Sequence, residues 1–207
     1  MHADVEIKAV LDNCRLDYVY EPDWHRLIDR AVRLLASSKT LAWFQPDEAA
    51  DGMPPLVLSD PAARFVRDNV NGFLLGRPLD QPIPLLLIGA EASRLVSALP
   101  PPHAVETCCG RPDAPAWFSP LTDEEGRCLA RTFDPAAAAK LESLCAAWHG
   151  RTGRPALAAV DFLVDREREV TTARAAVQGF FSSAIDALVA GHFLLMKDYW
   201  LMRAPLE

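Results

Sequence analysis

The chain has 207 residues, of which 50% are hydrophobic and 24% are charged, so its composition is that of a folded globular protein and excludes a disordered chain. Its formal net charge is −7, and the basic residues are scattered along the sequence. Because nucleic acid and anionic lipid both attract clustered positive charge, we expect neither nucleic acid nor a membrane as a partner. The length predicts a single domain over residues 1–207.

The five cysteines predict a reducing environment. They are odd in number, and a chain of this size has no need of disulfides to stabilise it. The first residues, Met1 to Asp4, lack the basic and apolar regions of a secretory signal. We therefore expect reduced thiols and a cytoplasmic location.

The first 36 residues predict a hairpin followed by a helix. Apolar and polar residues alternate over residues 5–11 and again over 16–20, and Asp12 and Asn13 between them favour a turn, which together indicate a β-hairpin. A short helix over residues 4–14 is the alternative. After Pro22, apolar residues at helical spacing predict a helix over residues 24–35.

The middle of the chain alternates short apolar runs with helical patterns. A loop is expected over residues 45–55. Asp60 and Pro61 then begin a helix that Gly76 ends. The apolar run 85–88, bounded by prolines and a glycine, predicts a buried strand followed by a helix over 90–99.

The region after residue 100 begins with an irregular, proline-rich segment. Two helices are then predicted, over residues 122–133 and 134–149. A strand near residues 157–164 follows.

The C-terminal segment predicts one long helix over residues 172–202, because no proline interrupts it. It is long enough to cross a bilayer. A polar stripe formed by Arg174, Gln178, Ser182 and Asp186 favours a core helix of a water-soluble protein instead.

Together these patterns predict an α+β fold, predominantly helical, in one compact domain. Its small β-sheet would consist of the N-terminal hairpin and the short strands near residues 85–88 and 157–164. The long C-terminal helix would lie in the core.

Small residues recur every four positions in the predicted C-terminal helix, at Gly179, Ser183, Ala187 and Gly191. Such a face lets another helix approach closely. Either a neighbouring helix of the same chain or a second protein, in a heterodimer or homo-oligomer, could occupy it.

Several cysteines and histidines are weak candidates for metal ligands. Cys145 and His149 lie four residues apart in a predicted helix, and His103, Cys108 and Cys109 could complete a zinc site. Cys145 also lies on the apolar stripe of its helix, as a buried thiol would, and no Cys-x-x-Cys pair is present. We therefore expect no metal. A reactive thiol at Cys108 or Cys109, beside Arg111, is a further alternative.

The sequence contains no signature of a known enzyme class. The nucleotide-binding, nucleophile-elbow and zinc-protease motifs are absent, so we expect no cofactor and leave open whether the chain is an enzyme. His25 and Asp29, one helical turn apart, could orient an imidazole for acid or base chemistry, although a solvated surface pair is the more common arrangement.

Two functional hypotheses follow. The first is a non-catalytic accessory or adaptor subunit that binds a protein or peptide partner, for instance beside a modifying or maturation enzyme. Its partner-binding residues would be the loop aromatics and the small-residue face: Trp43, Phe44, Trp117, Phe118, Gly179, Ser183, Ala187 and Gly191. The alternative is a small intracellular enzyme or metal-handling protein that uses the cysteine and histidine residues.

Overall fold

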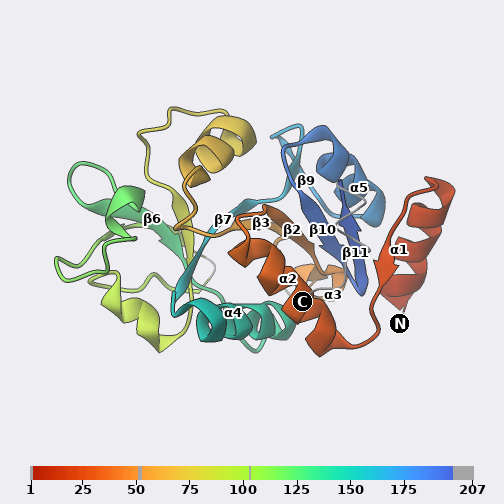
Figure 1. Cartoon of the computed structure of the whole chain (residues 1–207), viewed down its shortest axis with the longest axis horizontal. Helices are drawn as coiled ribbons and strands as arrows, with labels where there is room; N and C mark the ends of the chain where they lie inside the picture. The colour runs from red at the N-terminus through yellow and green to blue at the C-terminus, as the bar shows by residue number, and fades with distance from the viewer. Residues whose placement is uncertain (1, 51–52, 103, 198–207) are drawn as a thin grey trace. The chain divides into compact units, whose positions relative to one another are not determined.

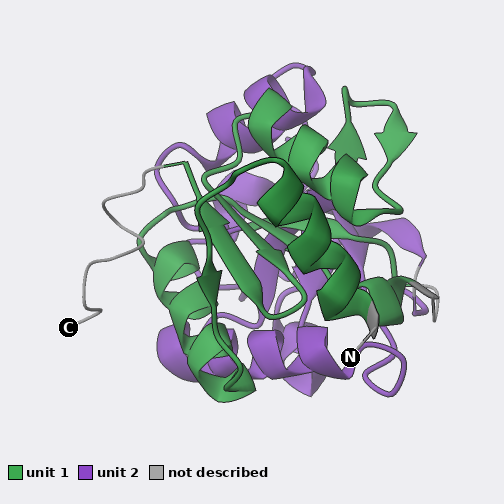
Figure 2. Ribbon diagram, turned by 90° about the vertical axis from the view of Figure 1, so that its right-hand side faces the viewer, with its two compact units in different colours: residues 1–58, 161–207 green, residues 59–160 purple. Residues whose placement is uncertain are grey.

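The computed structural model describes residues 2–50, 53–102 and 104–197. The chain forms two compact units, one of residues 1–58 and 161–207 (unit 1) and one of residues 59–160 (unit 2), coloured separately in Figure 2. Unit 1 is therefore built from both ends of the chain, and unit 2 is a continuous segment between them.

Unit 1 contains helices and strands from both ends of the chain (Figure 1). Its helices are α1 (His2–Asn13), α2 (Trp24–Ala36), α3 (Pro46–Ala50) and α5 (Ala173–Ser182). Its strands are β1 (Val19–Tyr20), β2 (Leu41–Phe44), β3 (Leu56–Ser59), β8 (Leu163–Val164), β9 (Arg168–Glu169), β10 (Ala187–Ala190) and β11 (Phe193–Met196).

The main sheet of unit 1 has the strand order β1-β11-β10-β2-β3. Strands β10 and β2 are parallel, with Val189 opposite Trp43, and the other described neighbours are antiparallel. Every residue of β2, β3, β10 and β11 is buried, which explains why these strands are continuous apolar runs. Helices α1 and α5 pack against each other, α1 against β11, α5 against β10 and α2 against β2.

In its described residues, unit 2 contains one long α-helix, three short helical segments and a second group of strands. The helices are η1 (Asp68–Leu75, a π-helix), η2 (Ala90–Arg94, 3₁₀), η3 (Ser119–Leu121, 3₁₀) and α4 (Ala139–Thr152). The strands are β4 (Pro84–Leu87), β5 (Val105–Cys109), β6 (Arg127–Arg131) and β7 (Ala156–Asp161), in the order β7-β4-β6-β5. Strands β4 and β6 are parallel, and the other two pairs are antiparallel.

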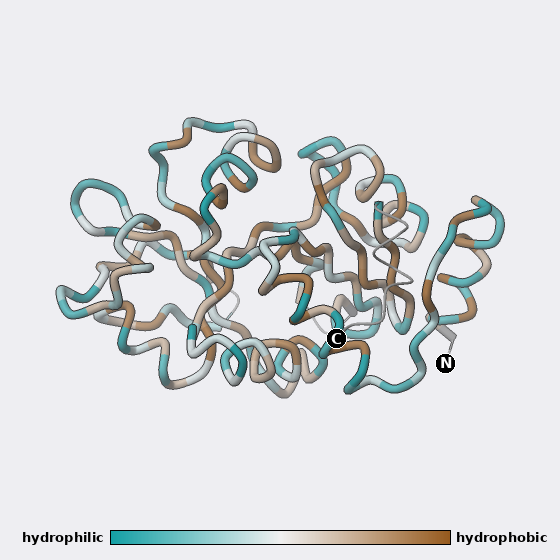
Figure 3. The backbone as a smooth tube through the Cα atoms, in the orientation of Figure 1, coloured by the Kyte–Doolittle hydropathy of each residue, from teal (hydrophilic) through white to brown (hydrophobic). Residues whose placement is uncertain are grey.

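The core of each unit follows its strands. Figure 3 shows the apolar residues gathered along the strands and the hydrophilic ones along loops and outer helical turns. In unit 2, the buried Trp148 of α4 donates its indole N–H to the carbonyl of Ala156 at 3.0 Å, so this helix is anchored to the start of β7.

The predicted fold class is wrong, because the chain is a mixed α/β protein whose strands form large mixed sheets. The strands expected near residues 85–88 and 157–164 correspond to β4 and to β7 with β8. They are accompanied by strands in segments that we expected to be loop or helix, such as β6, which lies inside the predicted helix 122–133.

The predicted N-terminal hairpin is wrong as well. Residues 2–13 form α1, in which Ile7 and Leu11, four residues apart, are both buried. Lys8 pairs with Asp12 one helical turn later. The second half of the predicted hairpin does become a strand, β1, but its partner is β11 from the other end of the chain. The alternation was therefore too short to distinguish the two structures.

The long C-terminal helix is also wrong, since α5 ends at Ser182 and β10 and β11 follow. The polar stripe ends at Asp186, and the apolar run 187–196 that follows fits a buried helix and two buried strands equally well. The pairing of β10 with β2 decides in favour of strands. The paired residues are about 146 positions apart in the sequence, so the local pattern cannot reveal this pairing. Asp186 precedes β10, accepts a hydrogen bond from the Thr40 N–H at 2.8 Å and pairs with Lys39.

Within the described residues, no helix is long and apolar enough to cross a membrane. Residues 198–202 of the predicted helix lie outside the described part of the chain.

Candidate functional site

A half-enclosed pocket of about 410 Å³ lies within unit 2, beside the start of η1. Its lining comes from three segments: the turn that leads into η1, the loop after η1, and the region of η3. The lining residues are Pro61, Ala62, Ala63, Arg64, Val66, Arg67, Asp68, Leu79, Trp117, Pro120 and Leu121. Small-molecule sites have this size and this kind of lining, mostly apolar with a few polar groups.

The first wall of the pocket begins at Asp60, whose carboxylate holds the turn in place. Its Oδ1 accepts a hydrogen bond from the Ala62 N–H at 2.8 Å, as expected for the residue before a helical turn. Both carboxylate oxygens of the buried Asp60 are also within 3.1 Å of the Arg154 guanidinium. This ion pair ties the turn to the segment that precedes β7, so the position of the wall does not depend on a free loop.

The π-helix η1 continues this wall. Its Asn71 is fully buried, and its amide N–H₂ donates to the carbonyls of Leu79 and Gln81 while its carbonyl accepts from Arg77. Gly76 ends the helix with a φ of 63°, which a glycine adopts without strain. π-Helices are rare and occur frequently at functional sites, which supports the choice of this region.

Arg67 connects the three segments of the pocket. Its guanidinium donates hydrogen bonds to the carbonyls of Leu79 and Gln81 in one loop, and of Pro120 and Thr122 in another. The five N–H donors of an arginine are thereby all engaged. Arg67 is a structural cross-link, and it has no donor left for a ligand.

Trp117 contributes an aromatic side chain to the lining of the pocket. Its ring packs edge-on against Phe118, with 6.0 Å between the centroids, and Phe118 is only 1% exposed. Trp117 itself is half-buried. A buried partner therefore fixes the orientation of a tryptophan whose other surface faces the pocket.

Two charged side chains of the pocket have no ion-pair partner among the described residues. Arg64 is exposed and its guanidinium lies 5.1 Å above the ring of Phe65. Asp68 is half-buried in the first turn of η1. Both residues line the pocket, so a cation and an anion lie beside its apolar surface.

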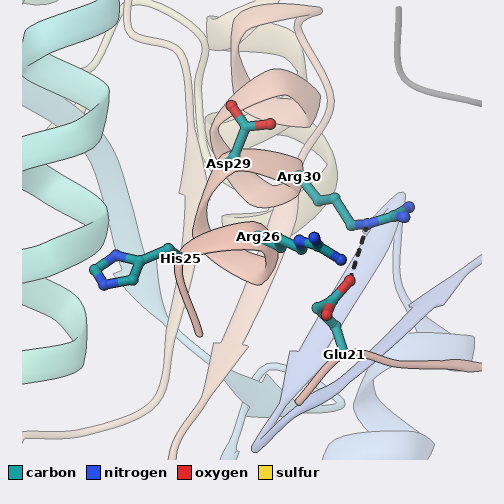
Figure 4. Close-up of a pocket in the computed structure, with 5 residues that line it drawn as sticks. All are labelled: Glu21, His25, Arg26, Asp29 and Arg30. Atoms are coloured by element: carbon teal, nitrogen blue, oxygen red, sulfur yellow. Dashed lines mark ion pairs between the residues drawn. The ribbon is translucent and has the colours of Figure 1, made fainter. Parts of the chain in front are cut away.

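A second hollow, of about 370 Å³, lies on the surface of α2 in unit 1 and is lined by Glu21, His25, Arg26, Asp29 and Arg30. Figure 4 shows that the His25 ring and the Asp29 carboxylate point away from the Glu21–Arg30 ion pair. The charges also pair along the helix surface, Arg33 with Asp29 and Arg26 with Asp23. We interpret this hollow as a solvated helix face, in which Asp29 pairs with Arg33 and not with His25.

The predicted partner-binding residues lie in different parts of the fold. Trp43 and Phe44 are in β2 and are 2% and 1% exposed, and Phe118 is equally buried, whereas Trp117 lines the pocket of unit 2. The small residues do not share a helix face: Gly179 is in α5, Ser183 follows it, Ala187 begins β10 and Gly191 is in the turn after β10. Within unit 1, Gly179 lies against Phe162. A partner-binding role for these residues stays a prediction.

The candidate metal ligands are likewise dispersed. Cys108 and Cys109 are in β5, Cys145 and His149 are in α4, and His103 lies outside the described residues. In the part of the chain that is described, no group of three or more histidine, cysteine or acidic residues could hold a metal ion. Burial raises the pKa of the Cys108 thiol, which makes it a poorer nucleophile than an exposed thiol.

Sequence reasoning missed Arg64, Arg67 and Asp68. They belong to the segment in which we predicted only a helix between Asp60 and Gly76. The sequence offered no local signal for them, because Phe65 and Phe73 fit the apolar spacing of the predicted helix and only the structure shows them 58% and 60% exposed.

Comparison with known proteins identifies the fold. Neither a family model nor a curated protein matches the sequence. Among solved structures, a double variant of P. abyssi Sua5 matches with a TM-score of 0.57 and 16% identity, over 81% of this chain and 49% of Sua5. P. abyssi Sua5 complexed with L-threonine matches with a TM-score of 0.56 and 14% identity, over 84% of this chain and 49% of that one.

E. coli YciO also matches, with a TM-score of 0.47 and 16% identity, over 68% of this chain and 65% of YciO. The chain spans about half the length of the Sua5 structures that it resembles. At these identities the likeness to Sua5 establishes a shared fold.

These findings contradict the predicted accessory or adaptor subunit, together with its peptide-binding and protein-interaction roles. The chain has the fold of Sua5, and three of the four aromatic residues that motivated the prediction are buried. The alternative, a cysteine- and histidine-based enzyme or metal-handling protein, has no clear support either.

The exclusion of nucleic acid as a partner is contradicted by the same comparison. It rested on a net charge of −7 and on basic residues scattered along the sequence, but residues far apart in the sequence can lie together on the folded surface, where recognition takes place.

Proposed function

We propose that this chain binds a free α-amino acid in the pocket of unit 2. The observation that carries the proposal is the presence of Arg64 and Asp68, both without an ion-pair partner among the described residues, beside the apolar walls of one pocket. An amino acid has the complementary arrangement, with a carboxylate and an ammonium group on one carbon and a side chain that projects away from both.

In the proposed complex the Arg64 guanidinium binds the ligand carboxylate, a geometry in which two parallel N–H donors reach two oxygens. The Asp68 carboxylate accepts hydrogen bonds from the ligand ammonium group. The ligand side chain then lies against Trp117, Leu79 and Leu121. Both residues line the same pocket, Arg64 from the turn that leads into η1 and Asp68 from the first turn of η1, so one small zwitterion can contact both.

The fold gives independent support. Sua5, whose fold this chain has, is known in complex with L-threonine, a free amino acid. The lining residues of the unit 2 pocket include no histidine, cysteine, serine or lysine, so the proposal is one of binding and assigns no reaction.

Isothermal titration with L-threonine and L-leucine tests the proposal. We expect saturable binding that Arg64→Met and Asp68→Asn each weaken by about 10- to 100-fold, because each removes a charge-assisted hydrogen bond worth about 1.5–3 kcal/mol. Arg94→Met is the matched control, since Arg94 is exposed, pairs with Glu91 and lies outside the pocket.

Modified ligands assign each charge to its partner. The amide of the amino acid lacks the carboxylate, so it should bind wild type weakly and be insensitive to Arg64→Met. The N-acetyl derivative lacks the ammonium group and should be insensitive to Asp68→Asn. Absence of binding by every free amino acid, or binding that neither variant changes, would rule the proposal out.

We further propose a cytoplasmic location. All five cysteines are free thiols, which is the state that a reducing compartment maintains.

A further inference from the structure

The walls of the unit 2 pocket differ from what threonine would require. Beyond Arg64, Arg67 and Asp68, every lining residue is apolar: Pro61, Ala62, Ala63, Val66, Leu79, Trp117, Pro120 and Leu121. None of these side chains accepts a strong hydrogen bond, and tryptophan can only donate one. A ligand hydroxyl placed against this surface would lose its bonds to water without replacing them.

Arg67 also occupies several main-chain acceptors beside the pocket. The carbonyls of Leu79 and Pro120, which belong to lining residues, accept hydrogen bonds from the Arg67 guanidinium, as do those of Gln81 and Thr122 beside them. A cross-link that holds the pocket together thus also occupies its nearby main-chain oxygens.

The size of the pocket points the same way. Its volume of about 410 Å³ lies in the range of sites that enclose ligands larger than the smallest amino acids. A ligand with a large apolar side chain removes more of Trp117, Leu79 and Leu121 from water, and that gain grows with the apolar area buried.

We propose that the pocket selects amino acids with large apolar side chains, such as leucine or phenylalanine, and discriminates against threonine. This inference rests on the proposed amino-acid binding and adds its specificity. It also separates this chain from Sua5, which has been solved with L-threonine.

The isosteres L-valine and L-threonine provide the sharpest test, since one methyl group replaces one hydroxyl. In isothermal titration of the full chain we expect valine to bind about 10- to 100-fold more tightly than threonine. Leucine and phenylalanine should bind more tightly than valine.

A pair of leucine variants connects this preference to the pocket. Leu79 lines it and is 46% exposed, whereas Leu99 is 43% exposed and does not line it. We expect Leu79→Ala to weaken leucine binding several-fold while changing threonine binding little, and Leu99→Ala to change neither.

The outcomes separate the two proposals. Threonine binding as tightly as valine, or equal losses for leucine and threonine in Leu79→Ala, would overturn the specificity and leave amino-acid binding intact. If no free amino acid binds, both proposals fail. Leucine binding that Arg64→Met and Asp68→Asn leave unchanged would also reject both, because the pocket would then not be the site.

Discussion

Gly191 determines how the start of α1 meets the turn between β10 and β11. Its φ is +54°, and a Cβ at this position would clash with Oδ1 of Asp4 and lie 2.9 Å from Ile7. Asp4 approaches this closely because its carboxylate accepts a hydrogen bond from the backbone N–H of His192, at 3.2 Å, and contacts the His192 ring nitrogen at 2.7 Å. The glycine predicted to be part of a helix face therefore serves a turn and its contact with α1 within unit 1.

We expect Gly191→Ala to lower the free energy of unfolding by about 2–4 kcal/mol, from the left-handed backbone and the clash with Asp4 together. Gly126→Ala is the matched control, because Gly126 has a φ of +73° but open space where the alanine methyl group would lie. It should cost only about 1 kcal/mol, the backbone contribution. Urea unfolding measures the free energy of unfolding of both variants. If both lose the same amount, the close contact with Asp4 does not contribute to the cost of Gly191→Ala.

At the scale of elements, the predictions from sequence failed where the local pattern was compatible with both a helix and a strand. Helix α2 was predicted well, because its apolar spacing and the Asp23 cap act within a few residues. The segment of β10 was mistaken for helix because its pairing with β2 is invisible in the local pattern. The candidate pocket was missed for the same reason, since Arg67 and Trp117 are 50 residues apart and meet only through the loops that Arg67 bonds.

The cross-link between η1 and these loops predicts a specific effect of Arg67→Lys. Lysine keeps the charge but has three donors on one nitrogen, so it cannot reach carbonyls on two loops. We expect a loss of about 1–2 kcal/mol in the free energy of unfolding, measured by urea denaturation. Arg94→Lys, at an exposed pair with Glu91, should stay within about 0.5 kcal/mol. Equal effects of the two substitutions would remove the structural role assigned to Arg67.

At the scale of the whole molecule, burial of the Cys128 thiol makes the stability of the fold depend on pH. Cys128 is fully buried in β6, directly opposite Cys108 of β5. Burial, with a smaller contribution from Cys108 and Cys109, raises the pKa of the Cys128 thiol from 9.0 to about 12. The folded chain therefore keeps this proton at pH values at which the unfolded chain has released it.

Because the folded-state pKa is the higher one, stability is complete below pH 9.0 and declines as the pH rises from there through about 12. We expect Cys128→Ala to flatten this decline, measured as the difference in urea-unfolding free energy between about pH 8 and pH 10.5. Cys14→Ala is the control, since Cys14 is exposed. The interpretation is refuted if both variants retain the wild-type slope.

The sequence by itself determined the apolar segments, several helix ends, the strands near 85–88 and 157–164, and the free state expected of the thiols, because these depend on composition and on neighbours within a few residues. Only the tertiary structure decided that both ends of the chain share one unit, that β10 and β11 replace a helix, and that Arg64, Asp68 and Trp117 line one pocket. The physical reason is distance along the chain: strand pairing and a pocket wall join residues whose local patterns carry no information about each other.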